Sequence, residues 1–143
     1  MRIHFVVACL AGVTLLSGCG KEGATVEINR KDVSVKVAGG DQTVALPDGF
    51  PKDAPIMPGG AIKTAMVAKD ITSVAMTTPS QVADVVKYYE DNLKAQGWTV
   101  APTQVVGQAT FVTATKDERN LSVQATKSND GSAVMMSLRP KGG

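Results

Sequence analysis

The sequence predicts an α+β protein of two layers, in which one amphipathic helix packs on an antiparallel sheet. Three observations predict this fold class. A single helical pattern covers about residues 79–96, two strand-like segments precede it, and three longer strand-like segments follow it. The predicted order is β-β-α-β-β-β, preceded by a short β-meander, and the helix is expected to cover one face of the sheet.

The first two strands of this order are predicted at 61–69 and 71–77, where strand-forming residues dominate. Asp70 interrupts them, and a break this short favours a tight hairpin or a bulged bend. We therefore expect the two strands to pair with each other in front of the helix.

The helix has start and stop signals at both ends. Thr78 is placed to cap it, Pro79 suits its first position, and Gln81 completes a capping box. Gly97 fits the left-handed position that follows a helix, and Trp98 is expected to pack back on the last turn, as in a Schellman motif. One apolar stripe should face the sheet, formed by Val82, Val85, Val86, Tyr89 and Leu93.

The strands after the helix complete the sheet. They are predicted at 98–101 (short), 110–116, 120–127 and 132–139. Turn-forming residues separate the longer ones. Apolar and polar residues alternate in the last two, which predicts one buried face and one exposed face. The buried face is expected to hold Leu121, Val123, Ala125, Val134, Met136 and Leu138.

A weak repeat precedes this domain, at 25–46. Pairs of apolar residues recur every nine residues: Val26 with Ile28, Val35 with Val37, and Val44 with Leu46. Two or three short antiparallel strands fit the pattern. We expect them to extend the sheet or to space it from a membrane. The alternative is a small repeat surface that binds another molecule.

Residues 47–60 contain four prolines, each of which fixes φ and removes a backbone donor. This segment is therefore predicted to be an extended Pro-rich linker into the α+β domain at 61–143.

Residues 1–18 are predicted to be a lipoprotein signal peptide. Met1-Arg2 gives a basic start, and the apolar stretch at 3–16 is too short to span a membrane, which takes about 20 apolar residues. The stretch ends in Leu16-Ser17-Gly18-Cys19, which resembles a lipobox. The resemblance implies that lipoprotein signal peptidase recognises Leu16, Ser17 and Gly18, and that Cys19 carries the lipid.

Residues 19–24 then form a lipidated tether to the membrane. Gly20 follows the cysteine, whereas in lipoproteins of Gram-negative bacteria an Asp there retains the protein in the inner membrane. The resemblance therefore implies the inner leaflet of the outer membrane, facing the periplasm, if the host has two membranes. The other cysteine, Cys9, leaves with the signal, so no disulfide is expected in the mature chain.

Composition argues against several functions. Fifteen basic residues, of which Arg2 leaves with the signal, balance 13 acidic ones, and this balance gives no reason to expect nucleic acid as a partner. The only histidine, His4, also lies in the signal, so the mature chain lacks the commonest metal ligand and general base. We expect no metal and no cofactor. Residues 18–23 match G-x-G-x-x-G, a nucleotide-binding motif. No strand-helix unit surrounds them, so the match predicts no such site.

Carboxylates are the remaining candidates for acid-base chemistry. Asp117 beside Glu118, and Asp48 near Asp53, could form pairs, although we interpret them as solvated turn residues. Tyr88 is the one aromatic residue of the domain expected to meet solvent.

Methionines could bind copper(I) through their thioether groups. Met66, Met76 and Met136, however, occupy strand positions where an apolar side chain would fill the core. Core packing is therefore the favoured interpretation.

Beyond the lipobox, three further features resemble a class of small bacterial lipoproteins of uncharacterised function. They are the segment from Leu46-Pro47-Asp48-Gly49-Phe50-Pro51 to Pro58-Gly59-Gly60, the helix with Tyr88-Tyr89 that ends in Gly97-Trp98, and the closing meander. This resemblance covers about two-thirds of the chain and implies no activity and no active site.

These observations predict a lipid-anchored cell-envelope protein that acts as a non-catalytic binding or structural module. Its expected partners are the membrane, through the lipid on Cys19, and another envelope protein. The alternative is a periplasmic inhibitor or chaperone-like module that captures soluble proteins. A third hypothesis, an enzyme that uses carboxylates alone, would need an Asp or Glu in a deep pocket.

Overall fold

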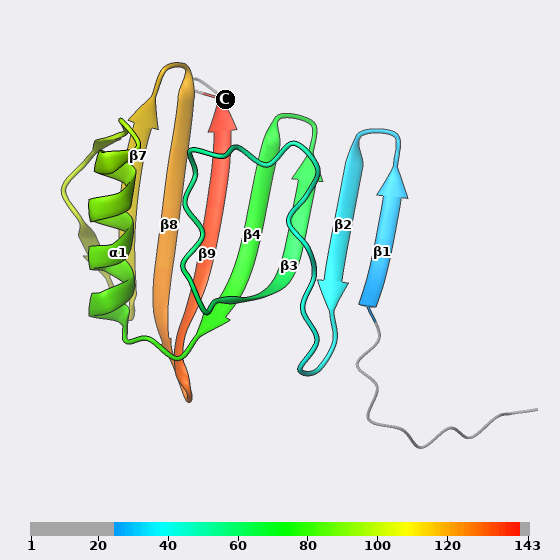
Figure 1. Ribbon diagram of the computed structural model, residues 1–143, viewed down its shortest axis with the longest axis horizontal. Coiled ribbons are helices and arrows are strands. Elements are labelled where there is room, and N and C mark those ends of the chain that lie inside the picture. Colours follow the sequence, from blue (N-terminus) through cyan, green and yellow to red (C-terminus); the bar gives the residue numbers. More distant parts are fainter. Residues whose placement is uncertain (1–24, 141–143) are drawn as a thin grey trace, which may run out of the picture.

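The computed structural model describes residues 25–140, and Figure 1 shows their arrangement. The elements are β1 (Thr25–Arg30), β2 (Val33–Ala38), β3 (Ala61–Ala68), β4 (Ile71–Thr78), α1 (Val82–Ala95), β5 (Thr99–Val100), β6 (Gln104–Val106), β7 (Ala109–Lys116), β8 (Arg119–Ser128) and β9 (Gly131–Pro140). All strands join one antiparallel sheet in the order β1-β2-β3-β4-β9-β8-β7-β5, and β6 also pairs with β7. The predicted α+β fold is confirmed, and β6 is an addition to it.

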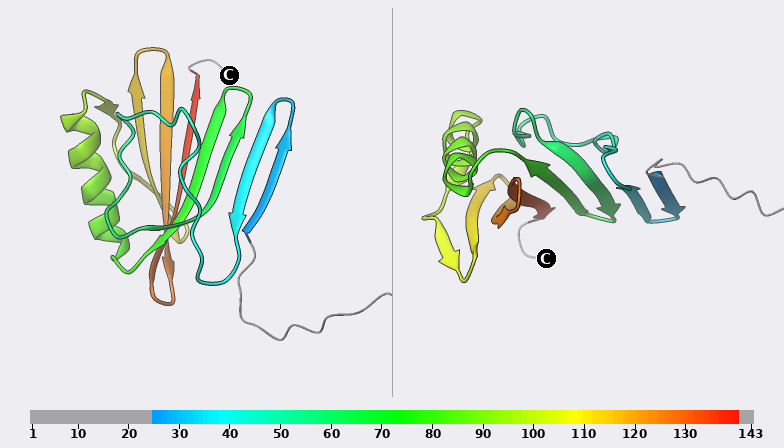
Figure 2. Two further views of the ribbon diagram at one scale, coloured as in Figure 1. Left: turned by 45° about the vertical axis from the view of Figure 1, so that its right-hand side comes forward. Right: turned by 90° about the horizontal axis from the view of Figure 1, so that it is seen from below.

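The second layer consists of α1 and the segment at 39–60, which lie on the same side of the sheet (Figure 2). The helix contacts β7 and β8. In the segment, Ala54 and Met57 are buried, and Leu46, Phe50 and Ile56 pack against the core. The stretch predicted to be a Pro-rich linker contains no helix or strand, and its apolar residues help to cover the sheet.

The helix begins later than predicted. Thr78 is still the last residue of β4, where it pairs with Ser132 of β9, so the chain cannot turn into a helix at Pro79. The N-cap is Gln81, which makes no side-chain capping hydrogen bond. The predicted capping box is therefore wrong, because sheet pairing holds Thr78 in extended backbone. The Ser132 hydroxyl instead donates to the Ser80 carbonyl at 2.7 Å and fixes the connection.

The end of the helix is as predicted. The Trp98 amide donates to the Leu93 carbonyl at 2.9 Å, and the Gly97 amide donates to the Lys94 carbonyl at 3.0 Å. Gly97 has a φ of 83°, in the left-handed region. These two bonds and this φ form a Schellman motif, which directs Trp98 back against the core, where it is 3% exposed.

The core lies between this second layer and the sheet. Val85, Tyr89 and Leu93 of α1 are fully buried. They meet the six strand residues predicted for the buried face, all of which are buried. Met76 and Met136 are core residues, as expected, and the Tyr89 hydroxyl lies 3.9 Å from the Met76 sulfur. Met66 is half-buried on the opposite face.

The β1–β2 hairpin extends the main sheet, because β2 pairs with β3. It forms the edge farthest from α1 (Figure 1). The third pair of the predicted repeat forms no strand: the Val44 amide donates to the Ile62 carbonyl at 2.9 Å, and the Val44 side chain is buried. Two strands of the predicted meander are thus present.

Candidate functional site

The predicted lipidation site lies outside the described residues. Leu16, Ser17, Gly18 and Cys19 precede Thr25, the first residue that the structure describes. Within the described residues, the candidates are therefore side chains of the folded domain. The first are the four carboxylates considered for acid-base chemistry.

Three of these carboxylates are exposed: Asp48, Asp117 and Glu118. Asp117 lies in the β7–β8 turn, its side chain is 78% exposed, and its Oδ2 lies 3.8 Å from an Arg119 nitrogen. Asp48 borders an open hollow beside β1 and β2. None of the three is enclosed in a deep pocket, which acid-base chemistry by carboxylates alone would need.

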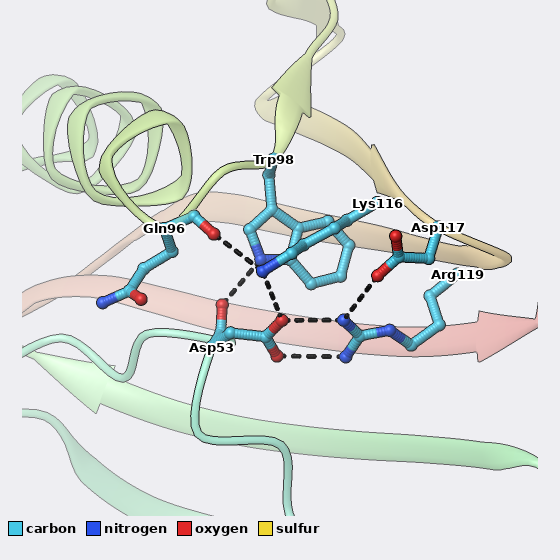
Figure 3. Close-up of polar contacts among 6 residues, drawn as sticks. All are labelled: Asp53, Gln96, Trp98, Lys116, Asp117 and Arg119. Atoms are coloured by element: carbon cyan, nitrogen blue, oxygen red, sulfur yellow. Dashed lines mark hydrogen bonds and ion pairs between the residues drawn. The ribbon is translucent and has the colours of Figure 1, made fainter.

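Asp53 is the exception, because it lies at the centre of a polar cluster (Figure 3). Its two carboxylate oxygens accept hydrogen bonds from both terminal nitrogens of Arg119, at 3.0 and 2.7 Å. Lys116 Nζ donates to the same carboxylate at 2.9 Å and to the Gln96 carbonyl at 2.8 Å. The Trp98 indole donates to the Asp53 carbonyl at 2.6 Å, and the Arg119 guanidinium lies 5.0 Å from the Trp98 ring centre.

This cluster, which we call the Asp53 latch (Asp53, Gln96, Trp98, Lys116, Arg119), joins three parts of the chain. They are the 39–60 segment, the end of α1 and the β7–β8 hairpin. The hydrogen bond from Arg119 is the largest cause that holds the pKa of Asp53 well below its usual value, and Lys116 adds to it. A carboxylate this acidic stays ionised near neutral pH and cannot shuttle protons there. The arrangement fits a structural role.

Other candidates are also placed by the fold. Within residues 25–140, no group of three or more acidic, histidine or cysteine side chains could hold a metal. Met57, Met76 and Met136 are buried in the core, whereas Met135 is 54% exposed on the other face of the sheet. Tyr88 does not project freely into solvent as predicted: it is partly buried, and its hydroxyl donates to the Ile56 carbonyl at 2.9 Å.

The face of the sheet opposite α1, which we call the outer face, carries most of the exposed apolar side chains. Paired residues on neighbouring strands point to the same side of a sheet. One row across the outer face therefore contains Ile28, Val35 and Met66, and the next contains Val26 and Val37. The outer apolar patch consists of Val26, Ile28, Val33, Val35, Val37, Met66, Ile71 and Met135.

The outer apolar patch is unusual in its exposure. The described residues include eight large apolar side chains that are exposed, and six of them belong to this patch, with exposures from 37% to 54%. The other two, Val105 and Val106, lie in β6. Isolated apolar residues on a surface need no explanation, whereas several exposed on one face are typical of an interaction site.

Charge is also distributed unevenly between the two faces. Glu27 is the only acidic residue in the nine strands of the described chain. It pairs with Lys36, which pairs with the buried Ala65, so Glu27 and Lys36 lie on the side of α1. The outer face therefore has no carboxylate at a strand position. It has two exposed arginines, Arg30 and Arg139.

The far end of the outer face, over β7 and β8, is hollowed and carries more polar side chains than β1 and β2 do. A cavity of about 450 Å³ opens there. Its lining includes Thr99, Thr113, Thr115, Asn120, Ser122 and Arg139. The outer face thus changes from apolar at β1 and β2 to hydroxyl-rich and amide-rich at β7 and β8.

The sequence contained part of this signal. The nine-residue repeat located the apolar pairs of β1 and β2, and the alternation predicted that each strand has an apolar side. Which side of the sheet they occupy depends on the register with β3, which the repeat does not determine. The Asp53 latch had no sequence signal, because its members lie as far apart as positions 53 and 119.

Comparison with known proteins supports the fold. The chain is similar to a family described as START domain-like over residues 62–132, just under half of the 143 residues. The antiparallel sheet with one helix is consistent with a START-like fold. The similar region runs from β3 through α1 to the start of β9 and does not include β1 or β2. No curated protein and no solved structure matches the chain.

Among the described residues, no helix has the length and apolar character that crossing a bilayer requires.

Proposed function

We propose that this protein is a lipid-anchored component of the bacterial cell envelope whose folded domain is a non-catalytic binding module. The observation that carries the proposal is the outer apolar patch, whose side chains share one face of the sheet, six of them exposed, with no carboxylate at a strand position of that face. A surface of this kind loses unfavourable contact with water when another molecule covers it. The outer face is therefore the proposed binding surface.

The proposed location follows from the sequence. The lipobox-like Leu16-Ser17-Gly18-Cys19 supports cleavage before Cys19 and attachment of lipid to it. A glycine at position 20 supports transport to the inner leaflet of the outer membrane in a host with two membranes. A mature lipoprotein carries several acyl chains on one residue, which gives stable attachment.

The proposal that the module is non-catalytic is supported by the state of its carboxylates. Asp53 is held ionised by two cations, while Asp48, Asp117 and Glu118 are exposed. An acid-base catalyst needs a group that changes protonation near the working pH. Arg119 and Lys116 hold the pKa of Asp53 below its usual value, and so away from neutrality.

A second candidate function is a module that captures soluble periplasmic proteins. The outer apolar patch favours it too, because inhibitors and chaperone-like modules bind through exposed apolar surfaces. The two candidates differ in whether the lipid anchor is needed for binding. In the leading proposal the partner belongs to a membrane-bound assembly, whereas in the second it diffuses freely.

Two experiments test these proposals. Palmitate labelling in cells should mark the native chain and be abolished in Cys19→Ala, which should also accumulate as uncleaved precursor. Labelling that survives this substitution would refute lipid attachment at Cys19.

The second experiment is crosslinking in living cells, which compares the anchored protein with a soluble version exported on an ordinary signal. Partners crosslinked only by the anchored form support the leading proposal, and partners shared by both support soluble capture. Ile28→Asp, on the outer face, should reduce crosslinking, whereas Asn29→Asp, on the opposite side of the same strand, should not.

A further inference from the structure

We propose that the outer face of the sheet lies on the lipid surface to which Cys19 is attached, so that the partner of the outer apolar patch is the membrane itself. This inference rests on the proposed lipid attachment and names the partner of the proposed binding surface. Four observations carry it: the position of the patch, the length of the tether, the distribution of charge, and the polarity gradient along the face.

The position of the patch is the first. Four of its six exposed side chains, Val26, Ile28, Val33 and Val37, lie on β1 and β2, the strands nearest in sequence to Cys19. Val26 and Ile28 are 52% and 49% exposed, and they come one and three residues after the start of β1. The element that follows the tether thus carries two of the exposed apolar side chains of the patch.

The length of the tether is the second. Five residues, Gly20 to Ala24, separate Cys19 from β1. An extended chain spans at most about 3.3–3.6 Å per residue, so β1 begins no more than about 20 Å from the lipidated cysteine. Acyl chains inserted in a bilayer would therefore hold Val26 and Ile28 close to the headgroup region.

The third observation is the charge on the face that would meet the membrane. With no carboxylate at its strand positions, the outer face would not be repelled by anionic lipids. Arg30 and Arg139 lie on this face, and neither forms an ion pair with a described residue. Arginines near a membrane surface are attracted to anionic headgroups. The acidic residue of β1, Glu27, points to the opposite side.

The polarity gradient is the fourth. The patch at β1 and β2 is apolar, whereas the lining of the cavity of about 450 Å³ at the other end includes four hydroxyls, an amide and Arg139 beside apolar groups. With the N-terminal edge nearest the acyl chains, the apolar part would contact the deeper region of the interface. The polar part would remain among headgroups and water. A second weak contact of this kind strengthens an anchor that already holds the chain.

The experiment uses the mature lipidated protein in vesicles of phosphatidylethanolamine and phosphatidylglycerol. With Cys19 acylated and Cys9 removed, a single introduced cysteine is the only free thiol. An environment-sensitive fluorophore is placed on Ile28→Cys or Met135→Cys, both on the outer face. Matched controls are Glu27→Cys, about half exposed on the other side of β1, and Lys87→Cys on α1.

Lipids that carry a nitroxide group on the acyl chain should quench the labels at positions 28 and 135 several-fold more than those at 27 and 87. Equal quenching at all four positions would overturn the inference. The inference would also be overturned if the fluorescence of the label at position 28 changed with the density of protein on the vesicles and not with the nitroxide. A second copy of the chain would then cover the outer face.

A failure of lipid attachment can be distinguished from a failure of the outer face to contact the membrane. Before labelling, the protein must carry palmitate and float with the vesicles. A chain that does neither refutes the proposed function and this inference together. A chain that does both and shows equal quenching refutes only the inference.

Discussion

The β1–β2 hairpin and the β8–β9 hairpin have the same alternation in sequence and opposite fates in the structure. In β8 and β9 the large apolar residues other than Met135 face α1 and the 39–60 segment, and Leu121, Val123 and Met136 are each 1% exposed. In β1 and β2 the apolar residues face away from the second layer, and Val26, Ile28 and Val37 are 39% to 52% exposed. Alternation predicts that a strand has an apolar side, but it does not determine which side is covered.

Register explains the difference. Lys36 pairs with the buried Ala65, so the polar side of β2 continues the covered face, and Val35 and Val37 fall on the outer face. A shift of one residue would exchange the two sides, because side chains alternate with a period of two. Because the apolar side chains of β1 and β2 remain on the outer face, folding of the chain does not gain the free energy of burying them.

The largest expected effect comes from placing a charge on the buried face of the sheet, and the same change on the outer face is the comparison. Val123→Asp should destabilise the fold by more than about 4 kcal/mol, because it buries an unpaired carboxylate. Val37→Asp should cost about 1 kcal/mol or less, since the position is partly solvated and only strand preference changes. Urea unfolding monitored by the fluorescence of Trp98, the single tryptophan, measures both. Similar losses would show that the outer face is covered in the isolated protein.

Truncation gives a smaller and more quantitative comparison. Leu121→Ala should lower the free energy of unfolding by about 2–5 kcal/mol, because it removes a buried side chain and leaves a cavity. Ile28→Ala, at 49% exposure, should cost well under half as much. Thermal unfolding in the absence of lipid can rank the two. If Ile28→Ala were the more damaging, the hairpin would belong to the core.

The Asp53 latch predicts an intermediate effect. Asp53→Asn should cost about 1–3 kcal/mol, because charge-assisted hydrogen bonds to Arg119 and Lys116 are lost while both cations stay in place. Asp117→Asn is the matched control, since its side chain is 78% exposed and lies 3.8 Å from Arg119. Chemical unfolding should show almost no effect for the control. Equal effects would mean that the 39–60 segment is held by apolar contacts alone.

The latch also predicts how stability depends on acid. The pKa of Asp53 in the folded state lies below its unfolded value, which is about 4. The folded state therefore binds fewer protons there, and this stabilisation is present above about pH 4 and is lost as the pH falls towards the lower folded pKa. Unfolding measured between neutral pH and about pH 2.5 should show a shallower acid dependence for Asp53→Asn than for the native chain. Parallel curves would exclude Asp53 as a source of acid sensitivity.

The smallest effect is expected in the β1–β2 hairpin. Lys36 and Glu27 lie 3.7 Å apart and are partly exposed, at 31% and 49%. Lys36→Gln should change the free energy of unfolding by less than about 1 kcal/mol, and added salt should remove the difference. A larger, salt-independent loss would show that this pair fixes the position of the hairpin.

Local patterns predicted most elements of the fold. Periodicity and turn residues identified α1 and the long strands, and the Gly97-Trp98 stop was correct because it depends only on neighbouring backbone. The helix start was wrong because Thr78 pairs with Ser132, a partner 54 positions away in sequence. The role of residues 39–60 as part of the second layer was missed for the same reason, since prolines predict an extended chain and not what it packs against.

By itself, the sequence determined the alternation of each strand, the amphipathic helix and its stop, the lack of histidine after position 4, and the lipobox-like motif at Cys19. Only the tertiary structure decided the register of β2 on β3, the Asp53 latch and the side on which the outer apolar patch lies. The physical reason is range. Alternation, helix stops and turns depend on residues a few positions apart, whereas a choice between the two faces of a sheet depends on pairing across tens of residues and on where the covering layer ends.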